Sequence, residues 1–309
     1  MNHLAVEIDP PKPVYRDNVV RAIGFICLAF SVFPFMNAGV KFLTPHYSMA
    51  QILWARYFGH LILMLLVFMP RRGLRLFATG HLGTQVTRSL AMLASTAFYF
   101  LGLKGTPLAT AASISFIGPL LVTALSVPML GEHVGPRRWA AVVIGFVGAL
   151  IIIRPGTGAV HWSALFVVGS AVAYALYQIL SRRMAAHDSP ETSVAYAALA
   201  GAAVTTLALP FGLRAPDNNL DLMVMLGLGL CGGTGHYFVV KAFETAPASA
   251  LSPFSYGQLI WATLLGYVVF GDFPDGWTWV GAAVIVVSGL YMIYREAQLK
   301  KITAPSPTP

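Results

Sequence analysis

Ten apolar runs, each close to the length of a membrane-spanning helix, follow one another along the chain and limit what it can fold into. A helix needs about 20 residues to cross the hydrocarbon core of a bilayer. The runs cover residues 21–43, 49–69, 83–103, 107–129, 137–153, 161–181, 192–212, 222–243, 248–270 and 277–294. Charged residues make up 10% of the chain, whereas about a quarter of a soluble domain is charged. We therefore predict an all-α membrane protein with ten transmembrane helices and exclude a soluble or a disordered chain.

The distribution of Lys and Arg predicts how the helices are oriented. Fourteen of the 20 basic residues fall on the side that would hold both termini and the even-numbered loops, and four fall on the other side: Lys41, Lys104, Arg154 and Arg214. Cytoplasmic loops are enriched in Lys and Arg. We therefore expect two cytoplasmic tails, 1–20 and 295–309. The net charge of +8 is explained by these flanks, so no nucleic-acid partner is expected.

The chain resembles itself at an offset of 140 residues, where 107–153 align with 247–293 without a gap. The residues that mark the ends of the spans in the two segments align in the same order: Pro107 with Pro247, Gly131 with Gly271, Glu132 with Asp272, and Trp139 with Trp279. Two repeats follow, 21–153 and 161–294, with five spans each. Because five is odd, the second repeat must cross the membrane in the opposite sense to the first. Inverted-topology repeats are typical of carriers with a midplane site that is exposed to each side in turn.

Two motifs carry a resemblance to a known family. Residues 99–109 have the sequence YFLGLKGTPLA and continue to SISFIGPL at 113–120; residues 246–256 have the sequence APASALSPFSY, followed by QLIWA at 258–262. Both resemble the EamA-type repeat of the drug/metabolite transporter superfamily, over about residues 20 to 295. The second motif is most similar to the branch of bacterial riboflavin importers and S-adenosylmethionine importers. The resemblance implies a ten-helix carrier in the bacterial inner membrane.

Ionisable residues inside the apolar runs are the first candidates for a solute site, because they are costly at membrane depth. Arg56 and His60 lie one turn apart on one face of the second span. Arg88, in the third span, either lines a cavity or extends its head towards water. His236 follows Gly229 and Gly233, a spacing that lets helices pack closely. We expect Arg56, His60 and His236 to face the interior; the alternatives are a head that extends towards water for Arg56 and a hydrogen-bonded structural role for His236.

Aromatic and amide side chains in the spans are the second group of candidates, since ligand sites combine apolar walls with a few fixed polar groups. The candidates are Tyr99, Ser115, Tyr177, Gln178, Tyr256, Gln258 and Trp261. On an ideal helix Tyr256 and Trp261 point about 140° apart. We therefore choose Tyr256, close to the break expected at Pro253, as the cavity residue of the ninth span.

No carboxylate is centred in a span, which disfavours coupling through an acidic residue. Facilitated exchange and coupling through His60 or His236 stay open. The sequence holds no G-x-S-x-G motif, no C-x-x-C and no Walker loop, so a membrane-embedded enzyme is disfavoured and no cofactor, metal or catalytic residue is expected. A channel is disfavoured by the inverted repeat within one chain. We expect a carrier of a small solute, best matched by riboflavin import, with S-adenosylmethionine import and amino-acid or drug export as alternatives. A monomer and a homodimer are both compatible with the sequence.

Overall fold

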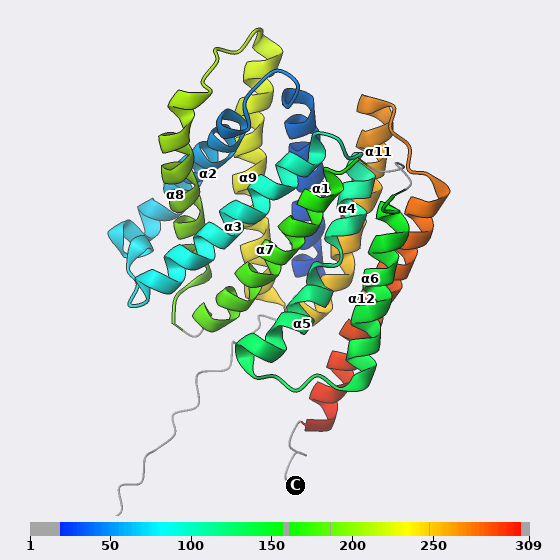
Figure 1. The fold of residues 1–309 in the computed structure, drawn as a ribbon. Coiled ribbons are helices and arrows are strands. Elements are labelled where there is room, and N and C mark those ends of the chain that lie inside the picture. Colours follow the sequence, from blue (N-terminus) through cyan, green and yellow to red (C-terminus); the bar gives the residue numbers. More distant parts are fainter. Residues whose placement is uncertain (1–18, 157–160, 186, 247, 304–309) are drawn as a thin grey trace, which may run out of the picture.

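The computed structural model describes residues 19–156, 161–185, 187–246 and 248–303, and within these residues every regular element is a helix. The first repeat contains α1 (Val19–Leu43), α2 (Met49–Arg72), the short 3-10 helix η1 (Gly73–Phe77), α3 (Leu82–Leu103), α4 (Leu108–Ser115), α5 (Gly118–Leu130) and α6 (Pro136–Ile153). The second contains α7 (Ala164–Met184), α8 (Pro190–Ala208), η2 (Leu209–Phe211), α9 (Asn219–Thr245), α10 (Ala248–Leu251), η3 (Ser252–Gly257), α11 (Gln258–Phe270) and α12 (Gly276–Thr303). Figure 1 shows their arrangement.

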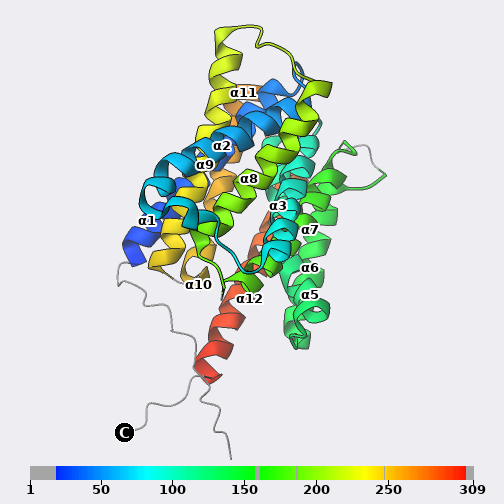
Figure 2. The ribbon, with the colours of Figure 1, turned by 90° about the vertical axis from the view of Figure 1, so that its left-hand side faces the viewer.

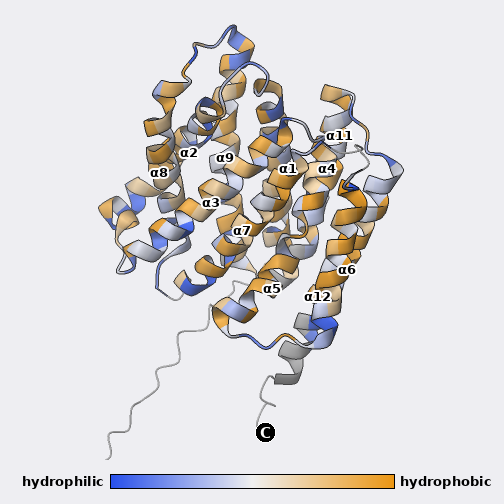
Figure 3. Cartoon of the chain, in the orientation of Figure 1, coloured by the Kyte–Doolittle hydropathy of each residue, from blue (hydrophilic) through white to orange (hydrophobic). Residues whose placement is uncertain are grey.

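The described helices account for the ten predicted spans. Within the described part of the chain, nine segments are long and apolar enough to cross a membrane. Apolar residues run along the helices, and polar residues gather in the connections (Figure 3). The remaining predicted span, 248–270, is divided among α10, η3 and α11. The all-α membrane fold of two inverted five-helix repeats is thus confirmed. Of the two predicted tails, residues 1–18 and 304–309 lie outside the described part, and α12 continues beyond the predicted end of the last span.

Helix contacts follow the two-fold relation that an inverted repeat requires. Helix α1 packs on α9 as α7 packs on α3, and α2 packs on α9 as α8 packs on α3. Equivalent helices of the two repeats also meet in pairs, α2 with α8 and α6 with α12, and the equivalent fourth and ninth spans meet where α4 packs on α11. In both views α2, α8 and α9 stand together on one side of the bundle, away from α6 (Figures 1 and 2). The two repeats therefore share one interface through the centre of the molecule.

The fourth and ninth spans are both interrupted, at equivalent places in the repeats. Between α4 and α5 the amide of Ile117 donates to the carbonyl of Ile114, three residues back, and Pro119 then stands in the first turn of α5. In the ninth span Pro253 lies in η3. Proline has no amide hydrogen to donate within a helix, and a 3-10 turn tightens the chain. Broken helices at matching positions are typical of inverted-repeat carriers.

Candidate functional site

The site begins where α2 and α9 cross, at Gly59 and Gly229. A β-carbon placed on Gly59 would lie 2.7 Å from the α-carbon of Gly229, so the two backbones are in contact there. The predicted small-residue pair is confirmed at its second member too, since Gly233 packs against the Leu63 side chain. Because the two helices approach so closely, Arg56 and His60 of α2 lie in contact with His236 of α9.

Arg56, His60 and His236 form one cluster across the two repeats. The imidazole rings of His60 and His236 are stacked, 5.1 Å between centroids and 6° from parallel. Nη2 of Arg56 lies 3.4 Å from Nε2 of His236, and its guanidinium lies over the Tyr57 ring, 4.1 Å from the centroid. Arg56 and His60 are 2% and 1% exposed. These two side chains are therefore held in the interior and not drawn out towards water.

Several donors and acceptors of this cluster have no protein partner. They are Nε and Nη1 of Arg56 and both ring nitrogens of His60, all buried. A buried polar group without a partner costs about 1–3 kcal/mol, and more when it is charged. Nearly all such groups in proteins are paired, so each exception needs an explanation. A polar ligand bound between α2 and α9 would supply the missing hydrogen-bond partners.

A small cavity of about 10 Å³ lies beside these atoms. It has room for about one water molecule. Its walls come from both repeats: Arg56, Tyr57, His60, Met92, Tyr177, Val194, Ala197 and His236. None of these residues, all within the described part of the chain, is acidic. The cavity therefore holds an Arg without a carboxylate beside it.

Arg88 lies next to this cavity, with its guanidinium over the ring of the lining residue Tyr177, 4.7 Å from the centroid. It is 2% exposed, so the alternative that its head extends into water is not what the structure shows. Its Nη2 donates to the Tyr177 hydroxyl at 3.1 Å, Nε donates to Ser181 at 2.7 Å, and Nη1 donates to the Ser193 carbonyl at 2.8 Å. Tyr177 thus faces the cavity while Arg88 fixes its hydroxyl.

Three other candidates lie outside the cavity wall. Gln178 donates to the exposed Tyr174 hydroxyl at 3.3 Å. Tyr99 lies beside Ser115, and the Ser115 hydroxyl donates back to the Ala111 carbonyl at 2.9 Å. Since Tyr99 and Ser115 pack around the break between α4 and α5, they stay candidates only for a wider arrangement of the cavity.

The candidates of the ninth span are also away from the cavity. Tyr256 packs edge-on against its repeat equivalent Phe116, 4.8 Å between ring centroids, and Trp261 packs against Phe35 of α1 at 5.5 Å. Gln258 is the first residue of α11. The 140° angle expected between Tyr256 and Trp261 does not apply, because Tyr256 lies in the 3-10 helix η3. That expectation assumed one continuous α-helix, and the break changes the rotation.

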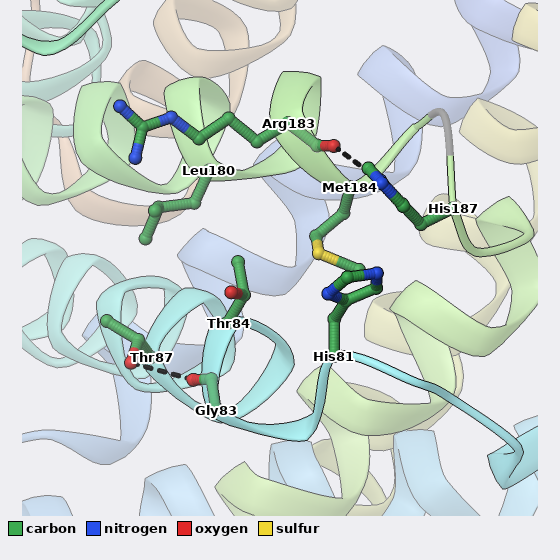
Figure 4. A pocket seen from close by; sticks show the side chains of 8 residues that line it. All are labelled: His81, Gly83, Thr84, Thr87, Leu180, Arg183, Met184 and His187. Atoms are coloured by element: carbon green, nitrogen blue, oxygen red, sulfur yellow. Dashed lines mark hydrogen bonds between the residues drawn. The ribbon is translucent and has the colours of Figure 1, made fainter.

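A second, larger pocket of about 250 Å³ lies between the start of α3 and the end of α7 (Figure 4). Its lining residues are His81, Gly83, Thr84, Thr87, Leu180, Arg183, Met184 and His187. The rings of His81 and His187 meet edge-on at 4.3 Å, and Figure 4 shows the Arg183 guanidinium pointing away from both. The pocket lies at the end of the bundle that holds the loops after α2 and α7.

Two antiparallel helical repeats around a polar cluster at their interface define a multi-pass membrane carrier of the inverted-repeat class. The model of the EamA-like transporter family matches residues 20–154 and again 161–295. The chain belongs to this family, and the predicted resemblance is confirmed.

Known relatives are transporters of small metabolites. The chain is 28% identical to a riboflavin transporter of Rhizobium johnstonii, over 97% of this chain and 98% of that protein. It is also 28% identical to an S-adenosylmethionine uptake transporter of Rickettsia prowazekii, over 83% of this chain and 86% of that protein. A solved crystal structure, 20% identical, matches with a TM-score of 0.63 over 94% of this chain and all of that chain, which shows a common fold. The chain is a small-metabolite transporter.

Proposed function

We propose that this carrier imports riboflavin across the bacterial inner membrane by alternating access, and that the solute binds among Arg56, His60 and His236. The observation that carries the proposal is the set of buried nitrogens on Arg56 and His60 without a protein partner. A guanidinium presents several donors in one plane, which suits a flat solute with carbonyl oxygens. The ring system of riboflavin is flat and carries two such carbonyls and a ring N–H beside apolar surface.

Alternating access is needed because the cavity is far too small for such a solute. Metabolite sites have volumes of about 300–1,000 Å³, whereas this cavity measures about 10 Å³. The two repeats must move apart around α2 and α9 to admit riboflavin. Tyr57 and Tyr177 already line the cavity, so they would supply aromatic surface to the widened site.

The absence of acid from the cavity wall supports riboflavin over S-adenosylmethionine, the second candidate. S-adenosylmethionine carries a sulfonium and an ammonium cation against one carboxylate, so its net charge is positive and its sulfonium lies away from the carboxylate. Beside Arg56, with no carboxylate among the lining residues, the sulfonium would be repelled in a medium of low dielectric constant. Rejection of a like charge is a common source of specificity.

Uptake in whole cells tests the proposal. The chain is expressed in a bacterial strain that cannot make riboflavin and grows only at high external riboflavin. We expect growth at low riboflavin, saturable accumulation of unchanged radiolabelled riboflavin, and no inhibition by excess S-adenosylmethionine. An Arg56→Ala variant expressed at the same level should not support growth. Uptake of S-adenosylmethionine without uptake of riboflavin would contradict the proposed substrate. Export of riboflavin from preloaded cells without import would contradict the direction.

A further inference from the structure

Among the ion pairs that join the repeats in the described part of the chain, two involve the first helix of a repeat, and they lie at opposite ends of the bundle. Nζ of Lys41 lies 2.7 Å from Oδ2 of Asp272, and Nη1 of Arg182 lies 3.6 Å from Oε1 of Glu132. Lys41 stands two residues before the end of α1, and Arg182 two residues before the end of α7. Each pair crosses from one repeat to the other.

The two acids are placed by the same helix ending. Helices α5 and α11 both end at a left-handed glycine, Gly131 with φ 67° and Gly271 with φ 70°. The amide of the next residue then donates six residues back, Glu132 to Ser126 at 3.4 Å and Asp272 to Gly266 at 2.9 Å. The two glycine amides donate four residues back, Gly131 to Val127 at 3.1 Å and Gly271 to Tyr267 at 3.0 Å, which is the hydrogen bond of the αL form of helix C-cap. The acids therefore occupy equivalent positions, one at each end of the bundle.

A second contact repeats in the same way. Ser48 caps the start of α2 and Ser189 caps the start of α8. The residue before each serine bonds to the first turn of a helix in the other repeat. The Tyr47 hydroxyl donates to Asp221 of α9, and Nε2 of Gln85 in α3 donates to Asp188, both at 2.6 Å. Each end of the molecule thus has an ion pair and a loop-to-helix hydrogen bond.

We propose that these contacts are two repeat-related gates, and that Lys41–Asp272 and Arg182–Glu132 are their ion pairs. When the cavity opens to one side of the membrane, the ion pair on that side must separate, while the pair on the other side stays formed. This inference rests on the alternating access of the proposed function but not on the identity of the solute. Both pairs are formed in this structure, in which the central cavity measures about 10 Å³.

The two gates differ in how strongly they are held. The side chains of Lys41 and Asp272 are 16% and 34% exposed, against 50% and 41% for Arg182 and Glu132. Lys41 also donates to the Thr106 carbonyl at 3.3 Å. Exposed ion pairs contribute little, whereas shielded pairs are screened less. The Lys41 gate is therefore the tighter of the two, and by the predicted orientation it faces outwards.

At the same end as Lys41, Asp275 forms a further ion pair with Arg154. Hydrogen bonds from Thr278, with a contribution from Arg154, hold the pKa of Asp275 below its usual range. A lowered pKa keeps this carboxylate ionised at neutral pH, and the charge is lost only as the pH falls through that lowered value. The Arg154–Asp275 ion pair therefore stays intact in experiments on the gates at neutral pH.

Thiol labelling without solute tests the gates directly. In a background with Cys27→Ala and Cys231→Ala, a reporter cysteine is introduced at the cavity wall by Ala197→Cys. A membrane-impermeant thiol reagent is added to intact cells or to inside-out vesicles. We expect Asp272→Asn to raise the labelling rate several-fold from one side only, and Glu132→Gln from the other side only. The predicted orientation assigns Asp272→Asn to the outside.

Two further sets of variants serve as controls: one exchanges the charges of the Lys41–Asp272 pair, and the other removes a neighbouring ion pair at each end. The exchange Lys41→Asp with Asp272→Lys should return labelling to the level of the parent. Adding Arg154→Gln to Asp272→Asn, and Arg72→Gln to Glu132→Gln, should strengthen each one-sided effect, because Arg72 pairs with Glu191 across the repeats at the Glu132 end. Labelling unchanged in all variants, raised from the same side by both, or not restored by the exchange would overturn the proposal. Because no solute is present, failure of riboflavin uptake leaves this result unaffected.

Discussion

His60 of α2 and His236 of α9 face each other with their rings 5.1 Å apart and nearly parallel, although they come from different repeats. Neither ring nitrogen of His60 has a protein partner, so the stack is not explained by hydrogen bonding between the two. The contact exists because the helices touch at Gly59 and Gly229. The candidate site is therefore a product of the repeat interface, and it should respond to changes at that crossing.

A side chain at the crossing should disturb the site from a distance. A β-carbon at Gly229 would lie 2.5 Å from the α-carbon of Gly59, and neither backbone can yield easily. We expect Gly229→Ala to cost about 1–3 kcal/mol and to lower riboflavin uptake, because it moves His236 away from α2. Thermal unfolding in detergent measures the first effect. Gly227→Ala is the matched control, since nothing lies within 4 Å of a β-carbon there. Equal unfolding temperatures for the two variants would contradict the crossing.

Arg88 should act by positioning Tyr177. In Arg88→Lys the charge stays, but one ammonium group cannot replace the bonds to Tyr177, Ser181 and Ser193. Loss of a charged hydrogen bond costs about 1.5–3 kcal/mol. We expect lower thermal stability and a raised KM for uptake, with kcat less affected. Arg71→Lys, at an exposed position of α2, should change neither quantity. An unchanged KM in Arg88→Lys would remove Arg88 from the site.

The ring nitrogens of His60 should matter more than its ring. His60→Phe keeps an aromatic stack on His236, worth about 1 kcal/mol, and removes the two polar atoms. We therefore expect normal expression and stability with riboflavin affinity weakened several-fold. His60→Ala should weaken affinity similarly and also lower stability. If His60→Phe bound riboflavin as well as the parent protein, His60 would be a packing residue.

The sequence predicts the helices and the repeat well because both depend on local patterns. Apolar runs, prolines and glycines mark the spans, and buried charge singles out Arg56, His60 and His236. The sequence does not show which helices pack against each other, because the spacing of residues along one helix does not identify the helix next to it. The cavity residues Tyr57, Met92, Val194 and Ala197 were missed for that reason, as ordinary residues of apolar helices. The break at η3 could not be placed to the residue, so the rotation of Tyr256 was also beyond the sequence.

Equilibrium binding of radiolabelled riboflavin to the purified protein in detergent, with and without Arg56→Ala, tests the central claim most directly. Two unpartnered guanidinium nitrogens are buried at the cavity, and 1.4 kcal/mol corresponds to about tenfold in Kd. We predict saturable binding to the parent protein, binding at least about tenfold weaker in Arg56→Ala, and parental binding in Arg71→Ala. Riboflavin that bound the parent and Arg56→Ala equally well would place the solute elsewhere and contradict the account.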